Sequence, residues 1–336
     1  KLNSLSMKVA IVGVSGAVGQ EFLKVLAERQ FPIDELLLFG SARSAGTEYE
    51  FRGKKYIVKE LQHGDDFKGV NIAFTSAGAS ISKEFAADIT KFGAIMIDNS
   101  SAFRMDTDVP LVVPEVNASD AKMCPRGIIA NPNCSTIQVI PVLKVLDELY
   151  GLKRVIYSTY QAVAGSGQKG IDDLEANLRG EDSKGYPHKI AFNLIPHIDT
   201  FLDNGYTKEE IKMVEETRKI LGLPDLKVTA TCVRVPVRMG HAVSVNVELE
   251  KPFDLKEVTE AFAKKEGVIV KDDVKNNVYP MPLEAAGKDE VFVGRIRRDD
   301  SVENGLNLWV VADNIRKGAA TNAVQIAEEL IKREIV

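Results

Sequence analysis

The chain has 336 residues, of which 45% are hydrophobic and 27% are charged, a composition that excludes disordered and fibrous proteins. Its formal net charge of -5 comes without a basic tail or a long run of Lys and Arg, so we expect no nucleic-acid partner. The apolar runs fall far short of the ~20 residues that a membrane-spanning helix needs, so we expect no membrane insertion.

The first residues of the chain and the number of cysteines indicate the cellular compartment. Residues 1–6 (KLNSLS) lack the apolar core and cleavage site of a secretory signal, and we expect Met7 to be the natural start. The 3 cysteines are an odd number in a large chain, which argues against a disulfide framework and for the cytoplasm. None of the cysteines and histidines has metal-ligand spacing, so we expect no metal site.

Short apolar runs alternate with amphipathic stretches through residues 1–131. This alternation predicts a parallel sheet with helices on its faces, the α/β doubly wound, Rossmann-type class that binds nucleotides. The expected strands are 8–12, 36–39, 71–74, 94–97 and 127–130, and the expected helices are 17–28 and 80–91.

After Tyr150 the sequence changes to longer β-rich runs, which we expect to form mostly antiparallel strands of a second domain. A helical period in 318–332 indicates a last helix that returns to the first domain. The predicted domains are therefore residues 1–131 plus 317–336, and residues 132–316. The expected strands of the second domain are 155–164, 226–237, 242–250, 291–296 and 306–312, and its expected helices are 169–178, 208–221 and 255–265.

A glycine-rich segment, VAIVGVSGAVG, joins the first expected strand to the first expected helix. Gly13, Gly16 and Gly19 allow a tight turn there and a close approach of the backbone to a pyrophosphate at the helix N-terminus. The spacing is G-x-x-G-x-x-G instead of G-x-G-x-x-G, so a glycine-rich turn without a ligand is the alternative.

The end of the second expected strand bears on the choice of dinucleotide. NAD-preferring sites carry an Asp or Glu there for the ribose 2'-hydroxyl, but this chain reads FGSARSAG over residues 39–46. The guanidinium of Arg43 and the neighbouring hydroxyls suit a 2'-phosphate, which predicts NADP. The alternative is that Arg43 is a solvated loop residue.

A candidate nucleophile, Cys134, lies in the segment IANPNCST, where an expected strand ends and a helix begins. The helix dipole and free amides at such a position lower the pKa of a thiol and can hold a developing oxyanion. A small buried apolar side chain is the alternative reading. Cys124 and Cys232 lack this setting, and we expect them to be inert.

A thiol nucleophile requires an acid/base partner, and the chain offers 4 histidines. Only His241 lies among other candidate residues, at the end of RVPVRMGH and at the entry to an expected strand. A structural histidine remains the alternative for this position. We expect His63, His188 and His197 to be structural or exposed.

Motifs along the whole chain together resemble the aspartate-semialdehyde dehydrogenase family, in matching order from about Met7 to the C-terminus. The motifs are GVSGAVG (13–19), RSAG (43–46), DNSSAFR (98–104), NPNCST (131–136), QAVAGSGQKG (161–170) and RVPVRMGH (234–241).

The resemblance implies a homodimer or homotetramer that converts L-aspartyl 4-phosphate and NADPH to L-aspartate 4-semialdehyde, phosphate and NADP. This reaction is a step toward lysine, threonine, methionine and isoleucine. The first domain would be the NADP-binding domain, and the second an α+β catalytic and dimerisation domain.

The resemblance also implies roles for individual residues. Cys134 resembles the acyl-thioester nucleophile, His241 the acid/base, and Gln161 the residue that positions the substrate. Glu209 and Lys212 are three residues apart and share one helix face, so both could reach one substrate. Arg234 matches the position that binds the α-carboxylate; Arg104, Asn133 and Lys212 match the phosphate-binding positions; and Glu209 would face the substrate ammonium. The implied NADP contacts are Ser15, Gly16, Ala17, Val18, Arg43, Ser44, Ser166, Gly167 and Asn314.

Two other functions remain open from the sequence. An N-acetyl-glutamyl-phosphate reductase would share the architecture and the thioester chemistry, but it has no need for an acid such as Glu209 to face a free ammonium. A catalytically silent dinucleotide sensor would keep the cofactor domain alone. The presence of Cys134, Gln161 and His241 argues against a sensor.

Overall fold

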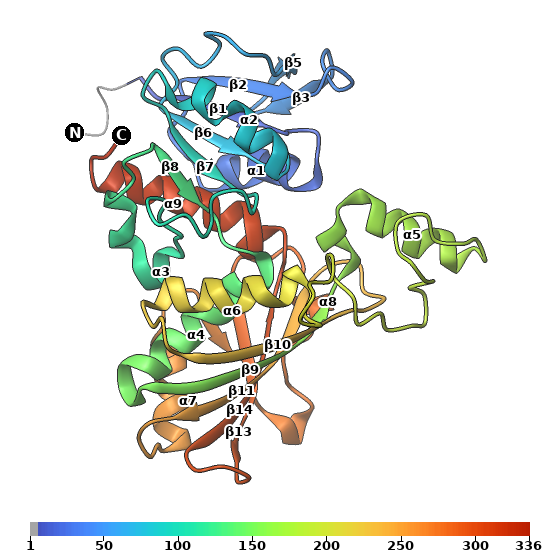
Figure 1. The fold of residues 1–336 in the computed structure, drawn as a ribbon, viewed down its shortest axis with the longest axis vertical. Coiled ribbons are helices and arrows are strands. Elements are labelled where there is room, and N and C mark those ends of the chain that lie inside the picture. Colours follow the sequence, from blue (N-terminus) through green and yellow to red (C-terminus); the bar gives the residue numbers. More distant parts are fainter. Residues whose placement is uncertain (1–5) are drawn as a thin grey trace. The chain divides into compact units, whose positions relative to one another are not determined.

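The computed structural model describes residues 6–336, which fold into two compact units (Figure 1). The first unit comprises the described residues up to Pro132 together with Ala319–Val336, and the second comprises Asn133–Gly318. The expectation about the start of the chain falls almost entirely on residues 1–5, outside the described residues.

The first unit is built on a parallel sheet with the strand order β5-β2-β1-β6-β7-β8. Helix α1 connects β1 to β2 toward one edge, and α2 connects β6 to β7 toward the other (Figure 1). The strand order therefore reverses direction between β1 and β6. Because crossovers between parallel strands are right-handed, two crossovers that run toward opposite edges place α1 and α2 on opposite faces of the sheet. The predicted doubly wound class is confirmed. The strands are β1 (Lys8–Val12), β2 (Glu35–Gly40), β5 (Lys59–Glu60), β6 (Ile72–Thr75), β7 (Ile95–Asp98) and β8 (Ile128–Ala130), and the two helices are α1 (Ala17–Glu28) and α2 (Ala79–Thr90).

The core of the first unit lies between its central strands, α1 and the last helix, α9 (Thr321–Lys332). Helix α9 packs against α1 and β7, with Ala323, Ile326 and Leu330 fully buried. Besides the two-residue strand β5, four short elements of this unit were not anticipated from the sequence. They are the hairpin strands β3 (Glu48–Phe51) and β4 (Lys54–Ile57), the helix α3 (Pro114–Asn117) and a 3-10 helix over Ala118–Lys122.

The second unit contains a mixed sheet with the order β10-β9-β11-β14-β13-β12. Three neighbouring pairs are antiparallel, but β9–β10 and β12–β13 are parallel, so the expected antiparallel pairing holds only in part. The parallel β9–β10 pair is possible because a long connection containing α5 (Gln168–Leu178) and α6 (Lys208–Leu221) returns the chain to the starting end of β9. The strands are β9 (Leu152–Gln161), β10 (Lys227–Arg234), β11 (His241–Leu249), β12 (Val268–Val270), β13 (Val291–Asp299) and β14 (Gly305–Ala312).

Helices α4 (Cys134–Tyr150), α6 (Lys208–Leu221) and α7 (Leu255–Lys264) pack on one face of this sheet (Figure 1). Helix α4 is buried along most of its length, which explains its apolar sequence. Helix α6 begins at a capping box between Thr207 and Glu210 and ends at Gly222, whose φ of 67° is left-handed. Side chains alternate between the two faces of the sheet along β9. One of those that point away from α4, α6 and α7 is Tyr160, which is exposed.

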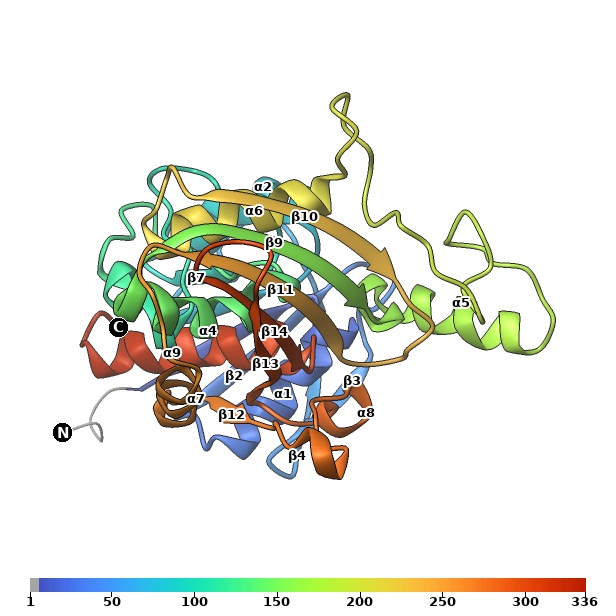
Figure 2. The ribbon, with the colours of Figure 1, turned by 90° about the horizontal axis from the view of Figure 1, so that it is seen from below.

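An arm containing α5 (Gln168–Leu178) and residues 179–206 projects from the sheet of the second unit (Figure 2). A small apolar cluster that includes Leu174 and Ile190 holds the arm together. Phe192 in this arm is 94% exposed. A short helix, α8 (Pro282–Ala285), precedes β13.

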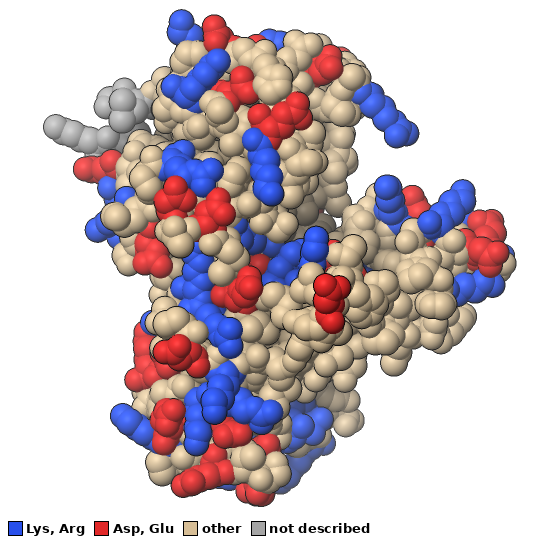
Figure 3. Space-filling view, in the orientation of Figure 1, with Lys and Arg blue, Asp and Glu red and all other residues tan. Residues whose placement is uncertain are grey.

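Side chains of both charges are interspersed on the face of the molecule shown in Figure 3. Among the described residues, no helix has the length and apolar character needed to cross a membrane. The same residues contain no cluster of three or more His, Cys, Asp and Glu side chains arranged to bind a metal.

Candidate active site

Three predicted site residues lie at one edge of the second unit's sheet. Gln161 ends β9, Arg234 ends the parallel strand β10 in register with it, and His241 begins the antiparallel strand β11. The neighbouring strand ends therefore bring together side chains that are far apart in the sequence. Gln161 and His241, for example, are separated by 80 residues.

Cys134 is the first residue of α4, as predicted, and Asn133 is the N-cap. The thiol lies 3.9 Å from Oδ1 of Asn133, and Cys134 is only partly buried. One turn further along, Nε2 of Gln138 donates hydrogen bonds to the carbonyl oxygens of His241 (2.9 Å) and Val310 (3.1 Å). Gln138 thereby fixes the start of α4 to the strand that begins with His241.

His241 is fully buried, and its Nδ1 accepts a hydrogen bond of 2.9 Å from the backbone N–H of Ala162. Burial, and then the positive charge of Arg234, lower the pKa of His241 well below its ordinary value, so the ring is neutral. Because Nδ1 is an acceptor, the single proton of the neutral ring is on Nε2. Nε2 is buried and has no hydrogen-bond partner among the described residues, which leaves its N–H as a donor for a ligand.

Arg234 is 5% exposed, and its Nη1 donates a hydrogen bond of 2.7 Å to the carbonyl of Ala162. Its Nε is buried and has no hydrogen-bond partner within the described part of the chain. The guanidinium carbon lies 5.8 Å from the centre of the Tyr186 ring. A buried guanidinium with an unused N–H is suited to bind a carboxylate.

Gln161 joins the strand-end residues to α6. Its Nε2 donates to Oε2 of Glu209 at 3.1 Å, and its Oε1 accepts from the hydroxyl of Thr159 at 2.8 Å. Both Gln161 and Glu209 are buried. This pairing fixes which end of the Gln161 amide faces the helix and leaves a buried carboxylate beside it.

One face of α6 carries Glu209, Lys212 and Glu216, at helical spacings of three and four. Lys212 forms an ion pair of 2.9 Å with Asp199, and Glu216 accepts the backbone N–H of Asn133 at 2.6 Å. Nδ2 of Asn133 is buried without a hydrogen-bond partner among the described residues. The residue before Cys134 therefore has a fixed backbone and an unused amide donor.

Arg104 belongs to the first unit, on the segment that follows β7. Its Nε donates to the carbonyl of Asn131 at 2.9 Å, and its Nη2 to that of Asn99 at 3.0 Å. The buried carboxylate of Asp98 accepts a 2.6 Å hydrogen bond from Ser100, together with bonds from two other hydroxyls. The DNSSAFR motif is thus largely a hydrogen-bonded scaffold for this segment.

The glycine-rich loop of the first unit is held by close backbone contacts. A Cβ on Gly13, whose φ is +85°, would lie 2.3 Å from the carbonyl oxygen of Ser76, and one on Gly19 would lie 2.1 Å from that of Gly13. Helix α1 begins with Ala17 and has no side-chain cap. Ser15 Oγ is buried without a partner among the described residues. This loop fits a dinucleotide pyrophosphate.

The predicted selectivity residues lie after β2. Arg43 is exposed and, within residues 6–336, makes no hydrogen bond or ion pair. Ser44 donates a hydrogen bond to the carbonyl of Ser41 at 3.2 Å. No acidic side chain follows β2 before Glu48, so the local chemistry is compatible with a 2'-phosphate.

The remaining implied NADP contacts belong to the second unit, where each has an identified local role. The hydroxyl of Ser166 is bonded to that of Tyr186 at 2.8 Å, and Gly167 caps α5 with a φ of +75°. Oδ1 of Asn314 accepts the backbone N–H of Gly240 at 3.0 Å. Their part in cofactor binding remains a prediction.

Sequence reasoning missed three residues that organise this site. Glu216 shares the helix face of Glu209 and Lys212, so its spacing was a usable signal. Gln138 is a buried polar residue in the otherwise apolar run IQVIPVL, which was also a signal. Ala162 acts through its backbone alone, so no feature of its side chain could have indicated it.

Comparison with known proteins defines the class first. A family model for the NAD-binding domain of semialdehyde dehydrogenases matches residues 8–124, and one for the dimerisation domain matches residues 143–317. Both parts of the chain thus match the domains of semialdehyde dehydrogenases, one that binds a nucleotide and one that forms dimers in that class.

Full-length relatives narrow the class. The chain is 55% identical over 340 residues to the aspartate-semialdehyde dehydrogenase of Aquifex aeolicus, covering 99% of this chain and 100% of that protein. It is 49% identical over 346 residues to the Bacillus subtilis protein of the same name, covering 98% and 99%. The crystal structure of aspartate semialdehyde dehydrogenase II from Vibrio cholerae, complexed with ASA, has a TM-score of 0.94 and 47% identity, covering 98% and 99%.

The chain belongs to the aspartate-semialdehyde dehydrogenase family. This membership confirms the predicted family, fold class and enzyme class. The matching family model also confirms an NAD(P)-type binding domain, the type expected for NADP.

Proposed function

We propose that this chain forms a thioester on Cys134 during the reductive dephosphorylation of L-aspartyl 4-phosphate to L-aspartate 4-semialdehyde. One arrangement supports the proposal above all. The ends of β9, β10 and β11 carry Gln161, Arg234 and His241, and Gln138 fixes the helix of Cys134 to the same edge of the sheet.

In the first step, the Cys134 thiolate attacks the acyl carbon, an S–C bond forms, and the C–O bond to phosphate breaks. Bound NADPH supplies a hydride for the thioester carbon. The Nε2–H of His241 donates a hydrogen bond to the oxyanion, which collapses to the aldehyde and releases the thiolate. Because Nδ1 of His241 accepts a backbone N–H, the geometry favours the donor half of the expected acid/base role.

The substrate would be held by opposite charges and unused donors. Arg234 would bind the α-carboxylate through its unpartnered Nε, and Glu209 would face the ammonium beside Gln161. Lys212 and the buried Nδ2 of Asn133 would bind phosphate, which requires Lys212 to exchange its ion pair with Asp199 for the substrate. Arg104 is assigned to phosphate on the family resemblance alone.

The cofactor would be held by the glycine-rich loop of the first unit. The uncapped amides at the start of α1, including those of Ala17 and Val18, and the orphan hydroxyl of Ser15 would receive the pyrophosphate. Arg43, with Ser44 beside it, would bind the 2'-phosphate. Ser166, Gly167 and Asn314 are proposed as further contacts from the family resemblance.

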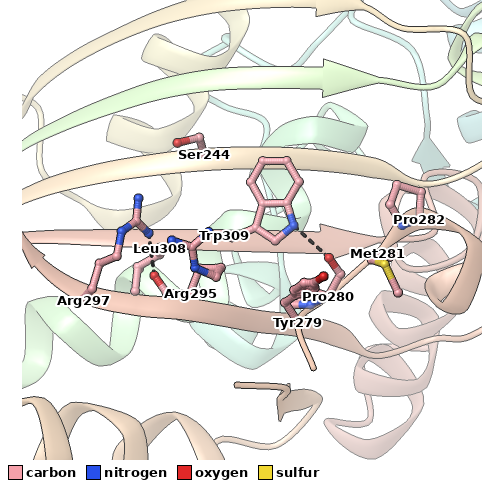
Figure 4. Close-up of a pocket in the computed structure, with 9 residues that line it drawn as sticks. All are labelled: Ser244, Tyr279, Pro280, Met281, Pro282, Arg295, Arg297, Leu308 and Trp309. Carbon is pink, nitrogen blue, oxygen red and sulfur yellow. Dashed lines mark hydrogen bonds between the residues drawn. The ribbon is translucent and has the colours of Figure 1, made fainter. Parts of the chain in front are cut away.

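The dimerisation domain would pair two copies of the chain through the sheet face opposite to helices α4, α6 and α7, the face on which Tyr160 is exposed. A cavity of about 330 Å³ on this face is lined by Tyr279, Pro280, Arg297 and Trp309, among others (Figure 4). The indole N–H of Trp309 donates to the carbonyl of Pro280 at 2.8 Å, which keeps the aromatic surface in place. Substituting Trp309→Asp should convert a homodimer to monomers in light scattering. An unchanged mass would contradict this interface, and a doubled wild-type mass would indicate a tetramer.

We also propose a cytoplasmic location, supported by the finding that Cys124, Cys134 and Cys232 form no disulfide. Fractionation of expressing cells should recover the activity with cytoplasmic marker enzymes. Recovery in a secreted fraction would contradict the proposal.

The substrate is tested by assaying NADP reduction with aspartate semialdehyde and phosphate, and separately with N-acetyl-glutamate semialdehyde. We expect a phosphate-dependent rate with the first substrate at least about a hundredfold above the second, because the acetylated amine would leave the buried carboxylate of Glu209 without an opposite charge. A preference for the acetylated substrate would support the reductase alternative.

A further inference from the structure

The turn after Gln161, a 3-10 helix over Val163–Ser166, lies against Arg234 and His241. The peptide groups of Ala162 hold both side chains, its N–H bonding to Nδ1 of His241 and its carbonyl to Nη1 of Arg234. The same carbonyl accepts the backbone N–H of Gly165 at 3.1 Å. This bond folds Gly165 back onto the two side chains.

Gly165 has no room for a side chain. A Cβ at this position would lie 2.9 Å from Nη1 of Arg234, and 3.1 Å and 3.2 Å from Cε1 and Nε2 of His241. Contacts between carbon and nitrogen are comfortable at roughly 3.5 Å or more, so a methyl group would push both groups away. The backbone at Gly165 is not in the left-handed region, so only space requires glycine here.

Neither neighbour can give way without losing a bond. Both Arg234 and His241 are buried, and each is tied to Ala162. Two further polar atoms of these side chains, Nε of Arg234 and Nε2 of His241, are buried without a partner among the described residues and would meet the substrate under the proposed function. A shift of a few tenths of an ångström therefore acts directly on the atoms that bind and react.

We propose that Gly165 is a positioning residue that sets the carboxylate-binding guanidinium of Arg234 and the donor N–H of His241 through the absence of a side chain. This inference rests on the proposed function of those two residues. Gly165 makes no side-chain contact of its own, and what the site requires at this position is empty space.

The test is Gly165→Ala in the full-length chain, with Gly185→Ala as the matched control. Gly185 lies in the following arm, also avoids the left-handed region, and a Cβ there would make only an ordinary contact of 3.4 Å with Asp173. Both changes remove similar backbone freedom from the unfolded chain. Gly165→Ala should raise KM for the semialdehyde and lower kcat, reducing kcat/KM at least about tenfold. Gly185→Ala should stay within about twofold of wild type, and a similarly small effect of Gly165→Ala would overturn the proposal.

A double-mutant cycle with Arg234→Ala separates positioning from general damage to the turn. Truncating Arg234 removes the closest atom, so adding Gly165→Ala should then cost less in both melting temperature and KM than it does in the wild type. Equal, additive losses in the two backgrounds would overturn the proposal. The melting temperatures test this coupling even if the wild type proves inactive with the semialdehyde, a result that would count only against the proposed function.

Discussion

The backbone N–H of Ala162 donates a hydrogen bond of 2.9 Å to Nδ1 of His241, and this contact determines what the imidazole can do. It places the proton of the neutral ring on Nε2 and presents an N–H donor to the site. A catalytic role for His241 therefore depends on a peptide group from the neighbouring strand end.

His241→Asn should lower kcat by roughly 10²- to 10⁴-fold with a smaller change in KM, because the ring acts on the developing charge. Burial lowers the pKa of His241 well below 6.5, so the wild-type ring stays neutral as the pH falls from 7 to 6. Protonation of Nδ1, which would break the bond from the Ala162 N–H and disturb the ring's position, should occur only at more acidic pH. A kcat profile with an inflection near pH 6.5 that His241→Asn abolishes would contradict the neutral assignment.

Alkylation should distinguish the three thiols. Burial raises the pKa of Cys232 far above its ordinary range and also raises the pKa of Cys124, so neither forms thiolate readily. Mass spectrometry after brief treatment with iodoacetamide near neutral pH should find Cys134 modified first. Equal labelling of all three cysteines would remove the argument for a selectively reactive thiol.

Arg234→Lys should reduce kcat/KM for the semialdehyde by about a hundredfold or more although the charge is kept. A lysine ammonium cannot bond to the Ala162 carbonyl and clamp a carboxylate in one plane as a guanidinium can. Arg238→Lys is the control, since Arg238 is an exposed residue paired with Glu175. Near-normal kinetics for Arg234→Lys would mean that the carboxylate binds elsewhere.

Arg43→Ala should lower kcat/KM with NADP by about ten- to a hundredfold, because one charge-assisted contact to the 2'-phosphate is lost. The rate with NAD, which lacks this phosphate, should change little. Lys83→Ala removes another exposed cation of the same unit and should affect neither cofactor. Parallel losses with NADP and NAD would show that Arg43 does not read the 2'-phosphate.

Local patterns in the sequence predicted the features that depend on a few neighbouring residues. The glycine-rich loop, the position of Cys134 at a helix start and the shared face of Glu209 and Lys212 all follow from short-range spacing. The family resemblance added the roles of Gln161 and Arg234, which no local pattern defines.

What the sequence did not predict depends on pairing between distant segments. The parallel register of Gln161 with Arg234 is set by how the long connection through α5 and α6 returns to the sheet. The bond from Asn133 to Glu216 joins residues 83 apart, and the peptide of Ala162 acts through atoms that every residue possesses. Such contacts carry no sequence signature until the fold is known.

The thioester on Cys134 is tested most directly by measuring phosphate-dependent reduction of NADP by aspartate semialdehyde with the wild type and with Cys134→Ala. The account predicts a phosphate-dependent rate for the wild type and no turnover for the variant, which should still bind NADP because the thiol is not required to hold the cofactor. Activity of Cys134→Ala within tenfold of the wild type would contradict covalent catalysis through this residue.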